Sequence, residues 1–364
     1  MKIKRIDVQV YRIPTDGPEE DGTLHWEATT MVLVEAVAAD GQRGLGYSYA
    51  SAAAATLIQE TLEQAVVGRR VQDVGAAWQA MVRSVRNLGR PGIASYAISA
   101  VDSALWDLKA RVQGSSLFQL LGAYRDMVPV YGSGGFTNYS LDHLREQLGA
   151  WVDAGISRLK MKVGKDWGTK PGEDIERVRV ARETIGPQAA LFVDANGAYT
   201  VKQAIQQAER FWEYGVTYFE EPVAFDQLDQ LAFIRGEIPM ALASGEYGYD
   251  VYDFRNTLLA GAVDILQADA TRCQGVTGCL QAAQLAHSFG VPFSTHTAPS
   301  LHAHIACAVP QIEHIEYFYD HTRIERMLFD GVLEPSEGSL HPDPSRPGLG
   351  LELKRKEAEK WKVG

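Results

Sequence analysis

The chain has 364 residues, of which 46% are hydrophobic and 22% charged, the balance of a folded protein of two or three domains rather than a disordered one. Its 46 acidic residues exceed its 35 basic residues and give a net charge of −11, which argues against general nucleic-acid binding. The three cysteines form no CxxC pair, which argues against a disulfide framework and favours the reducing cytoplasm. No apolar run is long enough to cross a membrane, and the strand-like start does not resemble a signal peptide. We therefore expect a cytoplasmic protein with neither nucleic acid nor a membrane as its partner.

Residues 1–125 are predicted to form a small α+β domain. Apolar residues alternate with polar ones over residues 3–13 and 30–38, which predicts two strands. After Tyr49 the apolar residues recur at three- and four-residue spacing, which predicts helices. The expected helices cover residues 52–66, 73–86 and 93–113. A sheet followed by a run of helices is typical of an α+β unit.

Residues 14–27 separate the two predicted strands and are rich in proline, glycine and acidic residues. This composition predicts a polar loop, which is either a mobile solvent loop or a lid over a binding site. A lid with so many polar side chains suits a substrate that carries hydroxyl groups, because buried hydroxyls need hydrogen-bond partners. In the lid interpretation, His25 or Trp26 contacts the substrate.

From Val128 onward, short apolar strands alternate with amphipathic helices. The predicted strands are Val128–Tyr131, Arg158–Val163, Ala190–Asp194, Thr217–Glu221, Met240–Ser244, Val263–Ala268, Val291–Thr295 and Ile312–Glu316. Alternation of this kind implies parallel strands with helical crossovers. Eight strands over residues 126–319 match a β/α barrel better than a doubly wound open sheet, which remains the alternative. The irregular segment 320–364 is expected to return to the first domain.

Titratable residues follow one predicted strand after another at intervals of about one strand and one helix. They are Asp194, Glu220, Glu246, Asp269, His296 and Glu316. Because the carboxyl ends of barrel strands meet at one end of the barrel, these groups are expected to lie together where such barrels build their active sites. Charged residues scattered at random over a surface would not recur at the end of each strand in this way.

Three carboxylates of this series, Asp194, Glu220 and Glu246, follow three consecutive strands. Carboxylates that converge on one point repel each other unless a cation neutralises them. Oxygen ligands suit a hard cation that keeps positions for water and substrate, so we expect one Mg²⁺ rather than Zn²⁺. Glu221 is expected to point to the opposite face of its strand.

Lys160 and Lys162 stand two residues apart on one strand and therefore share a face. The apolar residues between them indicate that the shared face is the barrel interior, where ammonium groups need anionic partners. Neighbouring cations lower each other's pKa, as a lysine that acts as a general base requires.

Asp269 and His296 follow neighbouring strands, so the carboxylate is expected to accept one imidazole N–H and leave the other nitrogen for proton transfer. Glu316 ends the last strand as either an acid at the edge of the core or a general acid that faces a substrate carboxylate. The remaining histidines of this region are interpreted as structural. They are His302, His304 and His314.

Together these residues resemble the enolase superfamily and, within it, the mandelate racemase subgroup of the mandelate racemase/muconate lactonizing enzyme family. The matching positions are Lys160-x-Lys162, Asp194 with Asn196, Glu220-Glu221-Pro222, Gly245-Glu246, Gln267-Ala-Asp269, His296 and the segment 100–107. The resemblance extends over nearly the whole chain and implies a modified (β/α)₇β barrel of the TIM type with an α+β N-terminal capping domain.

The resemblance also implies the roles of the residues and the reaction. Asp194, Glu220 and Glu246 would bind Mg²⁺, and Lys162 and the His296–Asp269 dyad would be bases on opposite faces of the substrate. Lys160 would support Lys162 and the substrate carboxylate, to which Glu316 would hydrogen-bond. The reaction would be abstraction of the proton α to the carboxylate of a small acid through an ene-diolate. Asn196 is expected to bind the substrate, and the protein is expected to be a homo-oligomer.

Within the family, the sequence favours the acid-sugar dehydratases, which convert an aldonate or aldarate into a 2-keto-3-deoxy acid. No lysine occurs between Lys202 and Lys354, which disfavours the muconate-lactonising branch, and Ala198 and Tyr199 stand where mannonate-type dehydratases usually carry a histidine. Racemisation, epimerisation or cycloisomerisation is the alternative reaction. From other classes, a non-catalytic sugar-acid-binding protein remains open, whereas a nucleotide-binding protein would need a glycine fingerprint that Gly132-Ser-Gly-Gly135 does not provide.

Overall fold

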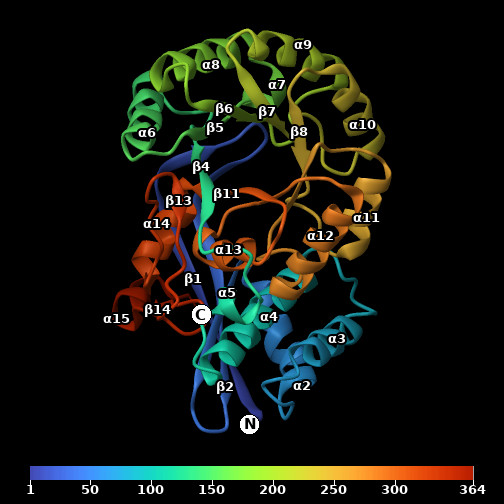
Figure 1. Cartoon of the computed structure of the whole chain (residues 1–364), viewed down its shortest axis with the longest axis vertical. Coiled ribbons are helices and arrows are strands. Elements are labelled where there is room, and N and C mark those ends of the chain that lie inside the picture. The colour runs from blue at the N-terminus through green and yellow to red at the C-terminus, as the bar shows by residue number, and fades with distance from the viewer. Residues whose placement is uncertain (364) are drawn as a thin grey trace.

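The computed structural model of the chain describes residues 1–363, and its N-terminal part is built on a three-stranded antiparallel sheet (Figure 1). The strands lie in the order β1 (Ile3–Glu20), β2 (His25–Ala38) and β3 (Arg43–Tyr49). The two predicted strands are therefore present but longer than expected. Trp26 pairs with Glu19 and His25 with Glu20, so strand pairing continues almost to the turn.

The prediction of a loop over residues 14–27 is wrong, because only residues 21–24 connect the two strands. The register shifts between Pro14 and Glu19, and this irregularity accommodates both prolines of the segment on an edge strand. In Figure 1 the hairpin of β1 and β2 extends from the N-terminal sheet to the barrel. The segment expected to be a loop is thus a stiff arm.

Helices pack against one face of this sheet. The elements are α1 (Ala53–Leu57), the π-helical turn η1 (Ile58–Leu62), α2 (Glu63–Val66), α3 (Val74–Ser84), α4 (Ile93–Val112) and α5 (Leu117–Leu120). The long helix α4 crosses β3 at Gly44 and Gly46, where a Cβ atom would lie 2.3 Å from backbone atoms of the helix. Glycine at these two positions lets strand and helix approach closely.

Eight parallel strands close into a barrel, because the last of them, β11, also pairs with the first, β4. These strands are β4 (Val128–Gly134), β5 (Arg158–Lys162), β6 (Ala190–Asp194), β7 (Val216–Glu220), β8 (Ala241–Ser244), β9 (Ile265–Ala268), β10 (Phe293–Thr295) and β11 (Ile312–Phe318). The short strand β13 (Ser339–Leu340) pairs antiparallel to β4 on the outside. The closed barrel confirms the predicted fold class and excludes the open sheet.

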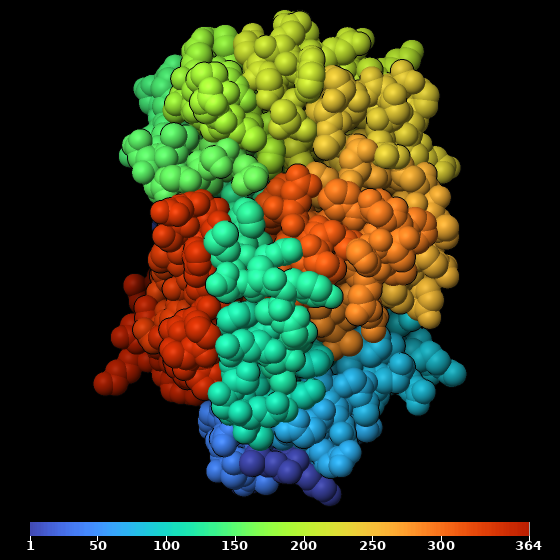
Figure 2. All heavy atoms as spheres, viewed as in Figure 1, coloured from blue at the N-terminus to red at the C-terminus, as the bar shows by residue number. Residues whose placement is uncertain are grey.

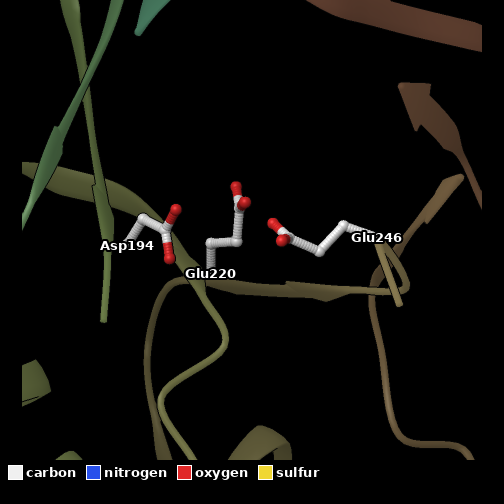
Figure 3. A group of neighbouring side chains, drawn as sticks. All are labelled: Asp194, Glu220 and Glu246. Carbon is white, nitrogen blue, oxygen red and sulfur yellow. The ribbon is translucent and has the colours of Figure 1, made fainter. Parts of the chain in front are cut away.

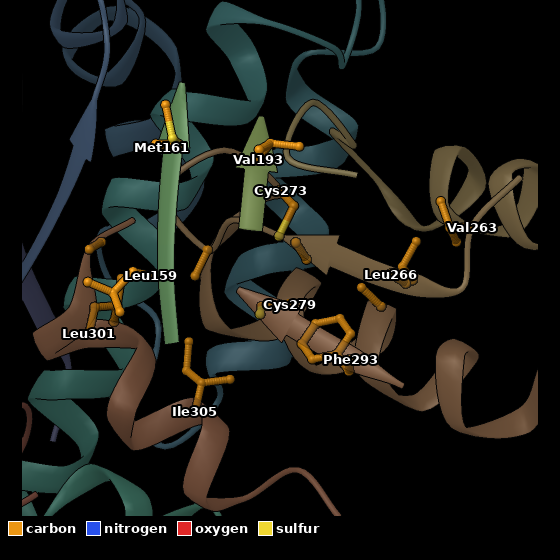
Figure 4. Packing of buried hydrophobic residues seen from close by; sticks show 14 of the residues in the cluster. Leu159, Met161, Val193, Val263, Leu266, Cys273, Cys279, Phe293, Leu301 and Ile305 are labelled. Atoms are coloured by element: carbon orange, nitrogen blue, oxygen red, sulfur yellow. The ribbon is translucent and has the colours of Figure 1, made fainter. Parts of the chain in front are cut away.

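Helices between the strands cover the outside of the barrel (Figures 1 and 2). They are α6 (Leu141–Asp153), α7 (Lys165–Gly168), α8 (Pro171–Ile185), α9 (Val201–Trp212), α10 (Leu228–Glu237), α11 (Val251–Leu259), α12 (Gly275–Phe289) and α13 (Pro299–Cys307). Apolar side chains such as Leu159 and Met161 of β5 and Phe293 of β10 fill the layer between strands and helices (Figure 4). Because side chains alternate along a strand, Lys160 and Lys162 point into the barrel.

The C-terminal segment lies beside both the barrel and the N-terminal sheet, as its red spheres in Figure 2 show. It contains α14 (Tyr319–Leu328), β12 (Phe329–Asp330), β14 (Glu352–Leu353), α15 (Arg355–Ala358) and the 3₁₀ turn η2 (Glu359–Trp361). Arg355 binds the Glu35 carboxylate of β2, and the backbone N–H of Val363 donates to Val10 of β1 at 2.9 Å. Among the described residues, no helix is long and apolar enough to span a bilayer.

Candidate active site

Three carboxylates meet inside the carboxyl end of the barrel (Figure 3). Asp194 ends β6, Glu220 ends β7 beside it in register, and Glu246 follows β8 after a glycine turn. Each offers a carboxylate oxygen, and these oxygens lie within 4.8 Å of one another. All three residues are buried. The strand-end spacing of the sequence therefore predicted their convergence correctly.

The three carboxylates fit one divalent cation with oxygen ligands. Glu220 Oε1 and Glu246 Oε2 are buried and have no hydrogen-bond partner in the described structure. Burial and the neighbouring Asp194 raise the pKa of Glu220 well above its usual range. A divalent cation would satisfy the orphaned oxygens and offset this repulsion, and hard Mg²⁺ prefers such a donor set.

The two inward lysines differ in their surroundings. Lys160 Nζ is fully enclosed and lies 2.6 Å from Glu220 Oε2, 2.9 Å from Glu316 Oε1 and 3.4 Å from Asp194 Oδ2. Among the described residues, Lys162 Nζ forms an ion pair with Asp194 alone, at 2.5 Å, and the side chain retains a little exposure. Lys160 thus binds the carboxylates together, whereas Lys162 is open on one side.

The expectation that the lysine pair has lowered pKa values is not met in this arrangement. Burial and the charge of Lys160 lower the pKa of Lys162, but Asp194, Glu246 and Glu220 together outweigh them and the net pKa is raised. For Lys160 the carboxylates of Glu220 and Glu316 likewise outweigh burial. Lys160 does lower the pKa of Lys162, as expected from the lysine pair, but the carboxylates opposite the pair raise it by more.

The Asp269–His296 dyad forms as expected. Asp269 Oδ2 lies 2.8 Å from His296 Nδ1, and Asp269 Oδ1 accepts the Thr271 N–H at 2.7 Å. Burial alone would raise the pKa of Asp269, but the hydrogen bond and charge of His296 lower it. His296 Nε2 faces the triad at 3.4 Å from Glu246 Oε2. The ring is therefore oriented with one nitrogen directed toward the site.

Glu316 bridges the two sides of the site. Its Oε2 accepts the Thr297 N–H at 2.7 Å, while its Oε1 binds Lys160. Burial raises its pKa, but Lys160 and His296 more than compensate and lower it. The ionised form is favoured in this arrangement, and the role of Glu316 toward a substrate carboxylate stays a prediction.

Arg272 belongs to the same cluster but was not predicted from the sequence. Its Nη1 lies 3.0 Å from Glu246 Oε1 and its Nε lies 3.5 Å from Asp269 Oδ2. Its guanidinium also lies over the ring of Tyr247 at 4.6 Å. Arg272 therefore connects a triad carboxylate to the dyad. A basic residue three positions after a strand-end aspartate was the available signal.

The tip of the β1–β2 hairpin docks on the barrel loops. The Gly22 carbonyl accepts the N–H of Trp167 at 2.9 Å, and a Cβ at Gly22 would lie 2.5 Å from the Ala195 carbonyl. Thr137 Oγ1 donates to the Asp21 carbonyl at 2.9 Å. Burial raises the pKa of Asp21, and the charge of Lys162 partly opposes this rise. The hairpin thus brings an acidic residue near Lys162.

The three residues predicted to bind substrate lie in different environments. Trp26 donates from Nε1 to Glu19 Oε2 at 2.8 Å and packs edge-on against Phe136 at 5.5 Å. Asn196 follows the triad residue Asp194 in a left-handed conformation, and its Oδ1 is buried without a partner. The His25 side chain is 51% exposed and lies 3.9 Å from Glu27. Trp26 and Asn196 are at the rim of the site, and their substrate contacts, like that of His25, stay predictions.

Other polar residues support the site from behind. His302 accepts the Ala270 N–H at 2.9 Å and its Nδ1 lies 2.7 Å from the Thr297 carbonyl, so it connects the loops that follow β9 and β10. His314 lies deeper in the barrel against Tyr131. Glu221 is buried, and its Oε1 accepts a hydrogen bond from Ser244 at 3.2 Å outside the triad.

Comparison with known proteins adds the family. Residues 143–358 match the enolase C-terminal domain-like family, and residues 8–122 match the mandelate racemase/muconate lactonizing enzyme N-terminal domain. The chain belongs to the mandelate racemase/muconate lactonizing enzyme family. The resemblance stated from the strand-end residues is thereby confirmed.

Curated relatives of the family include enzymes of two reaction types. The D-galactarolactone cycloisomerase of Agrobacterium fabrum is 31% identical, over 98% of this chain and 97% of its own length. The L-talarate/galactarate dehydratase of Salmonella typhimurium is 30% identical, over 91% of this chain and 82% of its own length. The chain is therefore similar over most of its length to both hydro-lyases and isomerases.

Solved structures of the family share the complete fold. A mandelate racemase/muconate lactonizing enzyme-like protein from Rubrobacter xylanophilus is 49% identical, with a TM-score of 0.96 and 100% coverage of both chains. A racemase from Streptomyces coelicolor, described with bound magnesium, is 31% identical, with a TM-score of 0.93 and coverage of 99% of this chain and 100% of that chain.

Proposed function

We propose that this chain is a Mg²⁺-dependent enzyme that removes the proton α to the carboxylate of a sugar acid and then eliminates a β-hydroxyl to give a 2-keto-3-deoxy acid. The observation that carries this proposal is the placement of two proton-transfer groups at opposite ends of one carboxylate triad. Lys162 contacts the triad at Asp194, and His296 contacts it at Glu246. Acid-sugar dehydratases among the relatives support the reaction type.

The chemistry requires negative charge to develop on the substrate carboxylate. Bound Mg²⁺ supplies Lewis-acid stabilisation of that charge. Lys160, held at the centre of the carboxylates, adds a fixed positive charge. Asp269 fixes the imidazole of His296 so that Nε2 faces the reacting atoms.

Lys162 and His296 divide the proton transfers between two sides of the substrate. One of them takes the α-proton, and the electron pair of the broken C–H bond moves into the carboxylate. That pair then returns to expel the β-hydroxyl, which takes a proton from the other group and leaves as water. The enol that remains tautomerises to the 2-keto-3-deoxy acid.

Cycloisomerisation or racemisation is the second candidate, because relatives that are 31% and 32% identical are cycloisomerases. These reactions share the first proton abstraction and differ in how the intermediate is resolved. Incubation of a set of sugar acids with Mg²⁺, followed by a keto-acid assay and product analysis, separates them. We expect 2-keto-acid formation that stops after chelation and returns with Mg²⁺. A product isomeric with the substrate would indicate the second candidate.

Exchange of the substrate α-proton with D₂O separates an enzyme from a sugar-acid-binding protein, because binding alone exchanges no carbon-bound proton. Binding without exchange by any sugar acid would contradict the proposal. We further propose a cytoplasmic, homo-oligomeric protein. Its three cysteines are free and buried, which supports a reducing compartment, and sedimentation velocity tests the assembly.

A further inference from the structure

The turn that follows β10 contains His296 and has an unfavourable backbone conformation. Thr297 and Ala298, the two residues after His296, both have positive φ angles, of 52° and 40°. Residues with a Cβ atom disfavour this region, so such a turn persists only where the surrounding structure holds it. Any group that anchors the turn therefore helps to fix the position of His296.

The helix that begins at this turn has no cap from its own side chains. Ala298 is the N-cap of α13 and makes no side-chain hydrogen bond, and Pro299 has no N–H group. The N–H of Ser300 is thus the first donor of the helix that needs an acceptor. Glu325 of α14 supplies one, because its Oε2 accepts the Ser300 hydroxyl at 2.7 Å and the Ser300 N–H at 3.3 Å. A side chain from a different helix replaces the missing cap.

Glu325 also contacts the N-terminal domain. Its Oε1 accepts the hydroxyl of Tyr47, which lies on β3, at 2.6 Å. Tyr47 and Glu325 are both fully buried. On the same two elements, Tyr49 stacks on His321 with ring centroids 3.4 Å apart. The contacts of Glu325 with Tyr47 and Ser300 therefore join the N-terminal sheet to the turn that contains His296.

The Glu325 carboxyl group has no cationic partner. Among residues 1–363 it forms no ion pair, and its side-chain partners are the hydroxyls of Tyr47 and Ser300. Burial raises the pKa of Glu325 to about 7, although the hydrogen bonds from Tyr47 and Ser300 oppose this rise. Burial of a carboxyl group without a cation is costly, and apolar side chains would pack two elements together at a lower cost. What Glu325 provides in return is its hydrogen bonds to the turn.

We propose that Glu325 is a positioning residue for His296, through which Tyr47 of the N-terminal sheet and Ser300 of α13 hold the turn after β10. This inference rests on the proposed function, in which His296 transfers a proton. Without Glu325, we expect the turn to relax and His296 Nε2 to lose its direction toward the triad. Lys162, on the other side of the triad, keeps its position.

The principal test is a double-mutant cycle on the full chain loaded with Mg²⁺. Glu325→Ala is expected to lower keto-acid formation about 10–100-fold, because a small displacement of a proton-transfer group is costly. In a His296→Asn background, the same substitution is expected to change the remaining rate less than about twofold, since a residue that acts through another is not additive with it. A loss of equal size in both backgrounds overturns the inference, because a general structural defect lowers every rate alike.

Two further substitutions separate positioning from stability. Glu325→Gln has the shape of the neutral carboxyl group and can still bond to Ser300 and Tyr47, so we expect activity within about threefold of wild type. A Glu325→Gln protein as impaired as Glu325→Ala would contradict the role of these hydrogen bonds. Asp107→Ala is the matched control, since Asp107 is also a buried carboxylate, and it accepts backbone N–H groups of β3 and of the C-terminal segment. Any loss in this control should be equal with and without His296.

A measurement without substrate keeps this inference separate from the proposed function, which fails if no sugar acid is turned over. In protein labelled with ¹⁵N-histidine, the imidazole signal that is absent from His296→Asn identifies His296. We expect this signal to shift or broaden in Glu325→Ala and to stay unchanged in Asp107→Ala. An unchanged His296 signal in a folded Glu325→Ala protein overturns the inference. If Glu325→Ala does not fold, Ser300→Ala and Tyr47→Phe, which each remove one hydroxyl, replace it with the same expected and contradicting outcomes.

Discussion

Two adjacent layers inside the barrel, built by the same strands, have opposite character. The lower layer is a neutral cluster of Tyr131, Phe192, Tyr218 and His314, and the upper layer contains Asp194, Glu220 and Glu316, each two residues further along its strand. Burial, reinforced by Arg158 and Lys160, lowers the pKa of His314 to about 3, which keeps it uncharged. Charge is therefore confined to the strand ends, where lysines compensate it. A floor of low polarity strengthens the ion pairs above it.

Breaking the charged layer at its metal site is expected to have the largest effect. Glu220→Gln removes a ligand, while Lys160 keeps Glu316 and Asp194 as partners. We expect loss of Mg²⁺ binding in calorimetry and about a 10³-fold or larger loss of activity, because several kcal/mol of charge stabilisation disappears. The neighbouring Glu221→Gln is the control. It removes a buried charge near the triad but no proposed ligand, so its Mg²⁺ affinity should change far less. Equal losses in both variants would contradict the ligand assignment.

Separate substitutions of Lys162 and His296 test the two sides of the charged layer. Lys162→Ala and His296→Asn are each expected to lower product formation by about 10²–10⁴-fold. Only the variant that lacks the base facing the α-proton should also lose deuterium incorporation at the α-carbon. The matched controls are Lys165→Ala, at a half-buried position of α7, and His287→Asn, at an exposed position of α12. Near-normal rates of both processes in both variants would show that the two-base assignment is wrong.

Replacing Arg272, which contacts Glu246 and Asp269 of the charged layer, is expected to have a smaller effect on activity. Arg272→Met removes the cation between Glu246 and Asp269 but retains an unbranched side chain against Tyr247. We expect about a 10–100-fold loss of Mg²⁺ affinity or activity, typical of residues that orient ligands. Measurement of both quantities, with Arg272→Lys as the partial rescue, checks this expectation. Wild-type values for Arg272→Met would mean that Glu246 and Asp269 need no bridge.

The smallest effect is expected in the neutral layer. The Tyr218 hydroxyl is buried without a partner, so Tyr218→Phe removes an unsatisfied group from an aromatic cluster. We expect the free energy of unfolding to rise by about 1 kcal/mol or less, with activity within about twofold of wild type. Chemical denaturation and the keto-acid assay measure both. A large loss of activity would show that the lower layer takes part in the chemistry.

The sequence predicted those parts of the site that repeat with the strands. Asp194, Glu220 and Glu246 could be found because each barrel strand places its last inward residue at the same end. The Tyr49–His321 stack could not, because it joins β3 to α14 and has no periodic signal. The direction in which the pKa values of Lys160 and Lys162 shift could not be predicted either, because it depends on the distances between these lysines and the carboxylates.

The hairpin was missed for a different reason. The prolines at 14 and 18 are strong loop signals, but β1 is an edge strand and its register shift between Pro14 and Glu19 tolerates them. Local sequence alone does not show whether a strand lies at an edge. The barrel strands, which are buried on both sides, gave clearer patterns and were predicted at nearly their observed bounds.

The fit of Gly22 against the barrel has a consequence for the rate of turnover. The hairpin tip holds hydrogen bonds to loops after two different strands, at Trp167 and Thr137, and its backbone leaves no room for a side chain at Gly22. Lifting the tip breaks these bonds together. In the proposed enzyme, we therefore expect the docked tip to slow the exchange of substrate and product. A larger residue at Gly22 is expected to weaken the docking of the tip. Product release would then be faster, and the intermediate would be more exposed to water.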